Sequence, residues 1–347
     1  MSAGLVVNGR FLGSRQTGMH RVGRGFIDSV RPHLPDLQVW APRGIADPRV
    51  DRVVGRASGD LQAQIWEQTL LPMRAGRRPM LSLANTAPIG GRNNVILVHD
   101  LGMMNRDGWF SRSMRAYAAV VGAAARRAEL ILTVSEVAAA ELATAGLTGK
   151  GGRRPEVVHP AIDEQFRRLP ASAVEETRLR LGLQRPYILV VGWTDPRKDV
   201  ATVVAAHRRL FAEREHDLVM VGQGKEEFGE IEDWQGDGIR KVGYVAEADM
   251  VALLNGAVAL AYPTRYEGFG LPPLESMACG TPALVSDLPV LRESSRGQAH
   301  FVPVGDVDAW VAALTRALHG DLGDPASIDW TWSDVGSRLN EVLAAVL

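Results

Sequence analysis

The chain has 347 residues, of which 46% are hydrophobic and 23% charged, and it contains one cysteine. This length is too great for one compact core and predicts two domains, while the single cysteine excludes a disulfide framework and a multi-cysteine metal site. No apolar run approaches the roughly 20 residues that a membrane span needs and the first residues do not resemble a signal peptide, so we expect a cytoplasmic protein.

The formal net charge of −1 conceals an asymmetry between the two halves. Residues 1–165 carry 21 Lys and Arg against 14 Asp and Glu, a balance of +7, whereas residues 166–347 carry 18 against 26, a balance of −8. A basic first half indicates an anionic partner, such as a phosphorylated lipid acceptor or the inner leaflet of a membrane. Arginines that merely solvate helices are an equally good interpretation. Nucleic acid is less favoured, because neither half has a dense basic stripe interleaved with aromatic residues.

The first half alternates short apolar runs with helical patterns. Strands are expected at Leu5–Val7, Leu37–Trp40, Asn94–Val98, Leu130–Val134 and Val157–Val158. Helices are expected within Thr17–Val30, over Arg112–Arg127, and from Ser135, as N-cap, to Gly146. Strands that are apolar on both faces and alternate with helices predict a parallel, doubly wound sheet. The proline-bounded segment Pro160–Pro170 is interpreted as an interdomain linker.

The second half repeats this pattern. Strands are expected at Tyr187–Val191, Leu218–Val221, Ala257–Ala261 and Pro282–Val285, and helices from Asp199, over Asp306–Leu318 and over Ser333–Leu347. Ligands of such sheets bind at the carboxyl ends of the strands. This rule directs attention to His99, Gly192, Gly222 and the loop after Ala261.

The segment Tyr262–Pro282 contains two glutamates, Glu267 and Glu275, with glycines between them and a Pro-Pro pair at a predicted helix start. A glycine loop that leads into a helix N-terminus offers free N–H groups and a positive dipole end to a phosphate. We expect Glu275 in the first turn of this helix, where it would accept hydrogen bonds from the two hydroxyls of a ribose. Glu267 would reach a sugar on the other side of a diphosphate.

This segment resembles the E-x7-E signature of the group 1 family of retaining glycosyltransferases, and the resemblance extends over nearly the whole chain. It implies the α/β GT-B fold, in which two Rossmann-like domains with doubly wound parallel sheets face each other across a cleft. Residues 1–165 would bind the acceptor, residues 166–325 would bind the nucleotide-sugar donor, and residues 326–347 would form a helix that crosses back to the first domain.

The resemblance also assigns roles to residues. Glu267 would contact the donor sugar and Glu275 the nucleotide ribose. The backbone of four consecutive residues would line the phosphate and sugar pocket: Gly268, Phe269, Gly270 and Leu271.

The segment Gly192–Asp199 follows a strand directly and contains Arg197 and Lys198. Fixed cations there could neutralise the charge that develops on a departing nucleoside diphosphate. The segment resembles the family's G-x-x-x-P-[RE]-K-[NG] element, whose lysine binds the diphosphate, although Trp193 stands where many members have an arginine. Lys198 and Arg197 are therefore catalytic candidates, and Gly192 belongs to the predicted donor site.

Three further places match the family. It has a histidine against the donor sugar at the position of His99, so His99 is a candidate for sugar contact and proton transfer, with Asp100 orienting its ring. The loop after the first strand resembles the family's T-G-[IM]-x-R element, in which Gly18 would let the backbone approach the phosphates or the acceptor and Arg21 would add charge. Gly222 begins a turn that resembles one near the nucleotide base.

Other motifs are interpreted as structural. Asp306 and Asp308 spell the D-x-D of metal-dependent glycosyltransferases, but they open an amphipathic helix far from the glycine loop, so capping is the better interpretation. Trp109 and Phe110, among several arginines, suit a membrane interface, an acceptor site or core packing equally well.

The sequence thus predicts a retaining, metal-independent hexosyltransferase without cofactor that builds cell-surface polysaccharide or glycolipid on a saccharide or lipid-linked saccharide. Trp66–Pro72, Asn85–Pro88 and Asp195–Lys198 look most like the mannosyl- and rhamnosyltransferase branch, which favours GDP-mannose over dTDP-rhamnose or a UDP-sugar. The enzyme would be cytoplasmic, with peripheral attachment to the inner leaflet as an option. A GT-B epimerase, a pyridoxal-phosphate phosphorylase and a non-catalytic nucleotide-sugar-binding protein stay open as alternatives.

Overall fold

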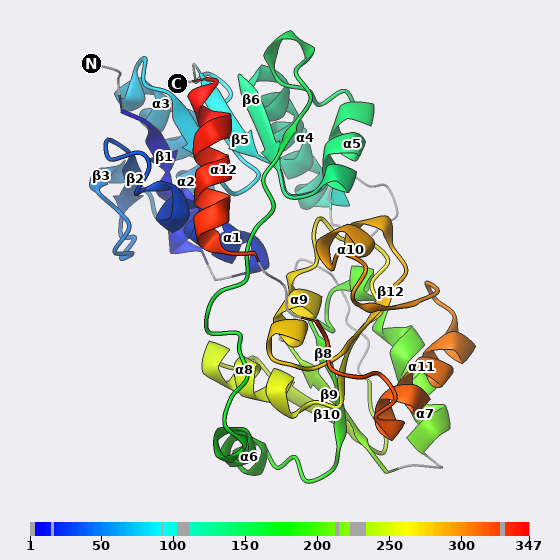
Figure 1. The fold of residues 1–347 in the computed structure, drawn as a ribbon. Helices are drawn as coiled ribbons and strands as arrows, with labels where there is room; N and C mark the ends of the chain where they lie inside the picture. The colour runs from blue at the N-terminus through cyan, green and yellow to red at the C-terminus, as the bar shows by residue number, and fades with distance from the viewer. Residues whose placement is uncertain are drawn as a thin grey trace. The chain divides into compact units, whose positions relative to one another are not determined.

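The computed structural model describes residues 4–14, 17–91, 93–102, 112–211, 215–222, 234–326 and 330–346. These residues form two compact units (Figure 1). Unit 1 comprises the described residues up to Ala161 together with those from Trp330 onward, and unit 2 comprises those between Ile162 and residue 326. The pair Trp109-Phe110 lies outside the described residues. Among the described helices, none combines the length and the apolar content of a bilayer span.

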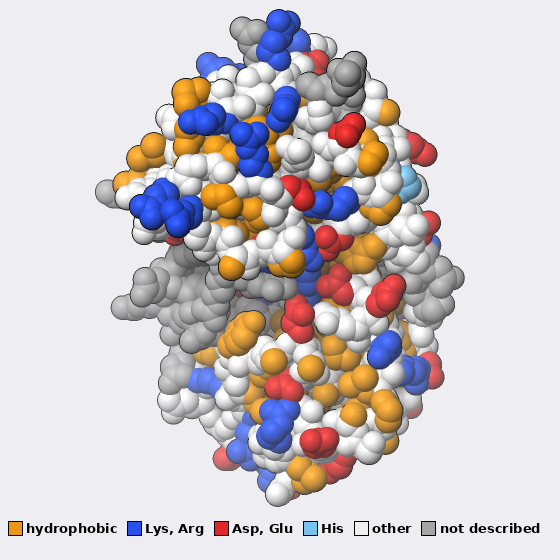
Figure 2. All heavy atoms as spheres, turned by 90° about the vertical axis from the view of Figure 1, so that its left-hand side faces the viewer, with side chains coloured by type: hydrophobic (Ala, Val, Ile, Leu, Met, Phe, Trp, Pro, Cys, Tyr) orange, Lys and Arg blue, Asp and Glu red, His pale blue; other side chains and the backbone are white. Residues whose placement is uncertain are grey.

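Unit 1 contains a seven-stranded parallel sheet in the order β3-β2-β1-β4-β5-β6-β7. Its strands are β1 Val6–Asn8, β2 Gln38–Arg43, β3 Arg52–Arg56, β4 Met80–Ser82, β5 Asn94–Leu97, β6 Leu130–Thr133 and β7 Glu156–Val157. Its helices are α1 Gly18–Val30, α2 Gly59–Gln68, α3 Leu70–Ala75, α4 Arg112–Arg127, α5 Glu136–Thr144 and α12 Trp332–Ala344, with 3-10 turns η1 Gly9–Gly13 and η3 Lys150–Gly152. Figure 2 looks onto the side of this unit that carries the edge strand β3.

Helix α12 joins unit 1 although it comes last in the chain, because it packs against α1 (Figure 1). Two glycines allow this close approach. A Cβ atom added to Gly25 would lie 2.2 Å from the Trp332 ring, and one added to Gly336 would lie 2.1 Å from the Ser29 carbonyl oxygen. The Phe26 and Trp332 rings meet edge to face, with centroids 6.2 Å apart. The apolar stripe of α12 is therefore buried against the first helix of the chain.

Unit 2 contains a six-stranded parallel sheet in the order β10-β9-β8-β11-β12-β13. Its strands are β8 Tyr187–Val191, β9 Asp217–Val221, β10 Ile239–Gly243, β11 Ala259–Tyr262, β12 Ala283–Ser286 and β13 His300–Val302. Its helices are α6 Ala171–Arg180, α7 Val200–Phe211, α8 Glu247–Gly256, α9 Leu271–Ala278, α10 Pro289–Ser294 and α11 Val307–His319, with the 3-10 turn η4 Pro196–Lys198.

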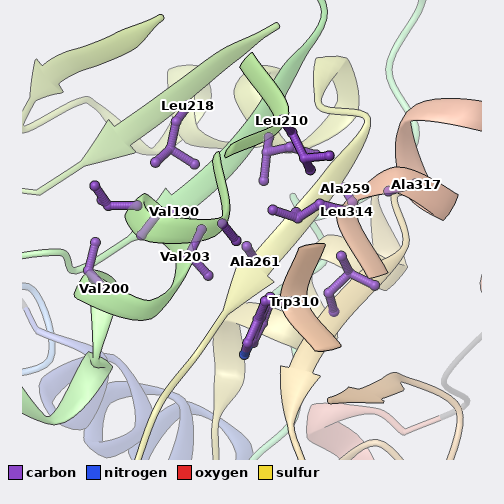
Figure 3. Packing of buried hydrophobic residues seen from close by; sticks show 14 of the residues in the cluster. Val190, Val200, Val203, Leu210, Leu218, Ala259, Ala261, Trp310, Leu314 and Ala317 are labelled. Atoms are coloured by element: carbon purple, nitrogen blue, oxygen red, sulfur yellow. The ribbon is translucent and has the colours of Figure 1, made fainter. Parts of the chain in front are cut away.

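The core of unit 2 shows why its central strands have no polar face. Val190, Leu218 and Ala261 of these strands pack against Val203 of α7 and Trp310 of α11 (Figure 3). Side chains on both faces of the central strands β8, β9, β11 and β12 are buried, so these strands are almost wholly apolar. The predicted doubly wound parallel sheets are confirmed in both units, whereas the cleft between them stays a prediction.

Candidate active site

The central feature of unit 2 is a contact between Lys198 and Glu267. Lys198 lies in η4, which follows β8, and Glu267 lies in the loop between β11 and α9. The Lys198 Nζ atom is 2.5 Å from Glu267 Oε1 and 2.5 Å from the hydroxyl of Tyr262, the last residue of β11. Parallel strands end at one edge of their sheet, so the topology brings together two residues that are 69 positions apart.

Tyr262 completes this cluster. The Lys198 ammonium lies 4.3 Å from the centroid of its ring, a cation–π contact. Burial, together with the neighbouring Glu267 carboxylate, raises the pKa of the Tyr262 hydroxyl well above its ordinary value. The hydroxyl is therefore protonated at neutral pH. Tyr262 was not predicted as a site residue, although its position at the end of a strand directly before the glycine loop indicates that role.

Arg197 was predicted as a cation for a diphosphate, and in the structure its side chain has a partner within its own turn. Its guanidinium makes a two-pronged pair with Asp195, with Nε 3.1 Å from Oδ1 and Nη2 2.7 Å from Oδ2. Burial raises the pKa of the Asp195 carboxyl, but the hydrogen bonds and charge of Arg197 outweigh this effect and hold the pKa below its ordinary value. Much of the Arg197 charge is therefore neutralised within its own turn, as that of Lys198 is by Glu267, and the role of both cations toward a diphosphate stays a prediction.

Gly192 and Gly222 lie side by side at the ends of β8 and β9. The Gly192 N–H donates to the Val221 carbonyl at 2.8 Å, and both glycines have positive φ angles, +75° and +142°. A Cβ atom added to Gly222 would lie 3.4 Å from the Gly192 Cα atom. That contact leaves room for a Cβ atom, so it is the positive φ angles that favour glycine at both positions.

The glycine loop leads into α9 as predicted. Gly270 is the N-cap of this helix with a φ of +88°, and a Cβ atom there would lie 2.5 Å from Leu291. Gly268 and Phe269 precede it, and the side chains of Phe269 and Leu271 are buried. The prediction for Glu275 was wrong in one respect: the helix begins at Leu271, so Glu275 lies in the second turn and not the first. Its side chain is 5% exposed.

In unit 1, His99 follows β5 with 8% of its surface exposed. Its Nε2 atom is 3.2 Å from the Leu83 carbonyl oxygen, and its backbone N–H donates to Asn85 Oδ1 at 2.8 Å. Burial lowers the pKa of the imidazole to about 4, so the ring is neutral at pH 7. Because Nε2 faces a carbonyl, Nε2 carries the proton and Nδ1 is the acceptor.

That Asp100 orients this ring stays a prediction. The Leu83 carbonyl lies against the imidazole, and the charge of Asp100 acts to raise the pKa of the ring against the effect of burial. The Asp100 carboxylate accepts the Gly102 N–H at 2.7 Å. Asp100 therefore shapes the loop after His99.

Gly18 and Arg21 lie in the first turn of α1, whose N-cap is Thr17. A Cβ atom added to Gly18 would meet no described atom within 4 Å. The chain therefore does not need a glycine here for its own packing, which is compatible with the predicted approach of a ligand to this turn.

A buried polar network near His99 escaped our sequence analysis. Glu67, 1% exposed, accepts hydrogen bonds at one oxygen from Arg10 at 2.8 Å, Asn8 at 2.9 Å and Thr86 at 3.0 Å. Burial lowers the pKa of Arg10, but Glu67 outweighs this and the pKa lies above its ordinary value. Thr86 directly follows the asparagine that binds the His99 backbone, so the network fixes the strand ends that surround His99.

The D-x-D motif is structural, as predicted. Asp306 is the N-cap of α11 and accepts the Ala309 N–H at 3.0 Å, while Asp308 pairs with Arg209. Within the described ranges, no group of three or more His, Cys, Asp or Glu side chains is arranged to hold a metal ion.

Comparison with known proteins assigns the family. Residues 185–320, which contain Lys198, Glu267 and Glu275, match the family model "Glycosyl transferases group 1". Over these residues the chain belongs to the group 1 glycosyltransferases. This finding confirms the resemblance on which the residue roles were predicted, although it does not test the roles themselves.

Curated relatives of this group 1 glycosyltransferase differ in the sugar they are named for. It is 31% identical over 206 residues to the O-antigen chain mannosyltransferase B of Escherichia coli, which covers 56% of this chain and 52% of that protein. It is 30% identical over 277 residues to the glycogen synthase of Mycobacterium tuberculosis, covering 72% of this chain and 63% of that protein. The chain thus spans about half the length of the E. coli relative.

Solved structures support the fold. HepE of Anabaena, in complex with UDP-glucose, superimposes with a TM-score of 0.70 at 15% identity, over 98% of this chain and 99% of that one. At this identity the likeness concerns the fold alone. Together with the two parallel sheets, it confirms the predicted GT-B class.

Proposed function

We propose that this chain is a retaining hexosyltransferase that moves a sugar from a nucleoside-diphosphate donor to a saccharide or lipid-linked saccharide. The observation that carries the proposal is the Lys198–Glu267 contact at the strand ends of unit 2, directly before the glycine loop and α9. This cluster combines a cation for a diphosphate, a carboxylate for sugar hydroxyls and a helix N-terminus for phosphate oxygens.

Each residue has one task in the proposed reaction. The acceptor hydroxyl oxygen bonds to the anomeric carbon on the face from which the diphosphate leaves, the bond between that carbon and the β-phosphate oxygen breaks, and the hydroxyl proton passes to the departing phosphate. The Lys198 ammonium has three donors, two of which contact Tyr262 and Glu267, so its third N–H is directed to the phosphate. It stabilises the charge of the leaving group as that charge develops.

Glu267 and His99 position the sugar in this scheme. The Glu267 carboxylate accepts hydrogen bonds from sugar hydroxyls while Lys198 and Tyr262 hold it in place. The neutral His99 ring presents Nδ1 as an acceptor for a sugar hydroxyl. With a pKa of about 4, His99 is a poor general base at pH 7, so this proposal gives it a positioning role and leaves proton removal to the phosphate.

GDP-mannose is the proposed donor, and cell-surface polysaccharide or glycolipid synthesis the proposed context. Support comes from the O-antigen mannosyltransferase of E. coli among the curated relatives. A glucosyl donor is the second candidate, because the more extensive match is to a glycogen synthase and a structural neighbour is solved with UDP-glucose.

A thermal-shift panel tests the donor first. GDP, UDP, ADP, CMP and dTDP are each added alone and as a sugar conjugate, and a ligand at about 100 times its dissociation constant adds roughly 2.7 kcal/mol to the stability of the folded state. We expect the largest shift with GDP and GDP-mannose, and its loss in Glu275→Gln, which keeps the size of the buried side chain. Glu175→Gln is the matched control, because Glu175 is exposed on α6.

Product analysis then tests the reaction. Incubation with the donor and a mannose-terminated acceptor should give a product with the donor's anomeric configuration, measured by NMR. Donor turnover without acceptor into an epimer would assign the chain to the epimerases. Donor binding with neither transfer nor hydrolysis would assign it to the non-catalytic binding proteins.

A further inference from the structure

The outward face of α2 and α3 carries three large apolar side chains that water reaches. Leu61, Ile65 and Met73 are 71%, 54% and 68% exposed. They fall on one row with Thr69, at steps of four residues. Helical hydrogen bonding continues through the junction of α2 and α3, because the Thr69 N–H donates to the Ile65 carbonyl at 3.0 Å and the Met73 N–H to the Thr69 carbonyl at 3.2 Å. Residues four apart in a helix lie one turn above each other, so Leu61 and Ile65 are neighbours on α2. Thr69, at the junction, has non-helical backbone angles (φ −122°, ψ −72°), and Met73 follows on α3. We call Leu61, Ile65 and Met73 the apolar ridge.

The core of unit 1 does not use this ridge. The opposite side of α2 and α3 supplies the packing: Trp66, Leu71 and Ala75 join a buried cluster with Val54 of β3. The Trp66 indole N–H also donates to the Val54 carbonyl at 2.5 Å. One side of α2 and α3 is therefore packed against the core of unit 1, while the apolar side chains of the other side face solvent. Scattered exposed apolar residues are ordinary, but a contiguous set marks an interaction surface.

Five arginines lie on α3, just beyond it and on the strand that packs against it, and we call them the basic rim: Arg52 and Arg56 of β3, Arg74 of α3, and Arg77 and Arg78 just beyond α3. None of the five pairs with a carboxylate within the described part of the chain. The guanidinium groups of Arg52 and Arg78 lie over the Trp40 ring, 4.7 Å and 5.4 Å from its centroid, in cation–π contacts.

The charge of this surface is one-sided. Between Arg52 and Arg78 the acidic residues are Asp60 and Glu67, and Glu67 is buried in the network with Arg10. Figure 2, which views the β3 side of unit 1, shows basic and hydrophobic side chains interspersed over its upper part. An apolar ridge beside arginines that have no carboxylate partner complements a lipid bilayer, which has phosphates at its surface and hydrocarbon beneath them.

We propose that the apolar ridge and the basic rim dock unit 1 onto an anionic lipid bilayer. Leu61, Ile65 and Met73 enter the boundary between headgroups and acyl chains, and the arginines bind lipid phosphates in two-pronged hydrogen bonds. A second copy of this chain is a poor occupant, because a two-fold contact of this surface with itself would set arginines against arginines. The surface contains no residue of the candidate donor site, so the proposal stands or falls independently of the reaction.

Vesicle co-sedimentation of the full chain tests the proposal. We expect binding to phosphatidylcholine vesicles that contain about one third phosphatidylglycerol, much weaker binding to pure phosphatidylcholine, and a steep loss with salt. Replacing Arg74, Arg77 and Arg78 by Gln should weaken binding roughly fivefold per arginine, about 100-fold in all. Replacing Leu61, Ile65 and Met73 by Gln should weaken it at least roughly tenfold and remove the part that survives high salt.

Matched controls come from elsewhere in the chain. Arg126→Gln with Arg127→Gln neutralises two exposed arginines at the end of α4, and Leu179→Gln alters a 65% exposed leucine on α6. Both variants should bind anionic vesicles as the unaltered chain does. Apart from Arg78, which is half-buried over Trp40, the replaced side chains are exposed, so folding should be retained, which nucleotide binding and circular dichroism verify.

Insertion depth gives a second measurement. Cys279 is buried and is the one cysteine in the sequence, so Leu61→Cys offers a single reactive site for an environment-sensitive dye. The dye should shift to the blue with anionic vesicles and not with neutral ones. Equal binding of all variants, or no blue shift on binding, would overturn the proposal. So would self-association without lipid that the ridge variants abolish, since it would assign the ridge to a second copy of this chain.

Discussion

The substitution Lys198→Met isolates the contact at the centre of the candidate site. The Lys198 and Glu267 side chains are 14% and 12% exposed, and their charged atoms are 2.5 Å apart. Methionine keeps most of the stem but leaves the Glu267 carboxylate nearly buried without its cation. Removing one partner of a buried pair costs about 3–5 kcal/mol, and because the residual exposure and the Tyr262 hydroxyl compensate in part, we expect about 3 kcal/mol. The loss of a charge-assisted hydrogen bond to the diphosphate should also weaken nucleotide binding about 10- to 100-fold.

A double-mutant cycle with Glu267→Gln measures this coupling. Hydrogen exchange of peptides from unit 2 in increasing urea gives its stability separately from that of unit 1. The double variant should be more stable than the sum of the single losses predicts, by about 2 kcal/mol. Lys150→Met, followed through peptides of unit 1, is the control, because Lys150 makes a 3.0 Å pair with Glu129 at 72% exposure and its loss should cost less than about 1 kcal/mol. Additive losses at Lys198 and Glu267 would refute the reasoning that they act as a pair.

Three further predictions test other parts of the structure. The folded-state pKa of His99, about 4, lies below the unfolded value of 6.5, so the unfolded state binds the proton first as pH falls. The stability of unit 1 should therefore fall by about 3 kcal/mol between about pH 6.5 and about pH 4. Urea-dependent hydrogen exchange of unit 1 should show this fall, and His99→Gln should lack it. Gly270→Ala should destabilise unit 2 by about 1–3 kcal/mol, because φ is +88° and its Cβ meets Leu291, whereas Gly18→Ala should leave the melting temperature unchanged. Glu67→Gln should destabilise unit 1 by about 3 kcal/mol in the same exchange experiment, since it removes the charge that three buried donors share; unchanged protection would contradict the role given to the network.

The sequence indicated the central strands better than the peripheral ones. Tyr187–Val191 coincides with β8, and Ser135 caps α5 by accepting the Ala138 N–H, as predicted. The strands β3 and β10 were missed because each is an edge strand with charged residues, so neither has the continuous apolar run that marks a buried strand. The three-residue strand β4 is too short for any period to show.

Within the candidate site, motif spacing predicted positions better than partners. It selected Lys198 and Glu267 separately, and their contact follows from the order of β8 and β11 in the sheet, which a linear pattern does not contain. The motif predicted that Arg197 binds a ligand. The pair that this side chain makes with Asp195 depends on the geometry of a short turn, which a sequence motif does not show. The buried Glu67 network could not be predicted because its members come from three separate segments, at residues 8–10, 67 and 86.

The return of α12 to α1 has a consequence for how the protein is made and re-engineered. During translation the strands of unit 1 emerge from the ribosome early, but α12, which covers α1, emerges only after the whole of unit 2. Gly25 and Phe26 of α1 therefore stay uncovered by α12 while unit 2 is synthesised. A fragment ending at Ala161 should therefore be prone to aggregation. A circular permutant that places residues 330–346 ahead of Gly4 would make unit 1 one continuous stretch, so that each half could be produced and studied alone.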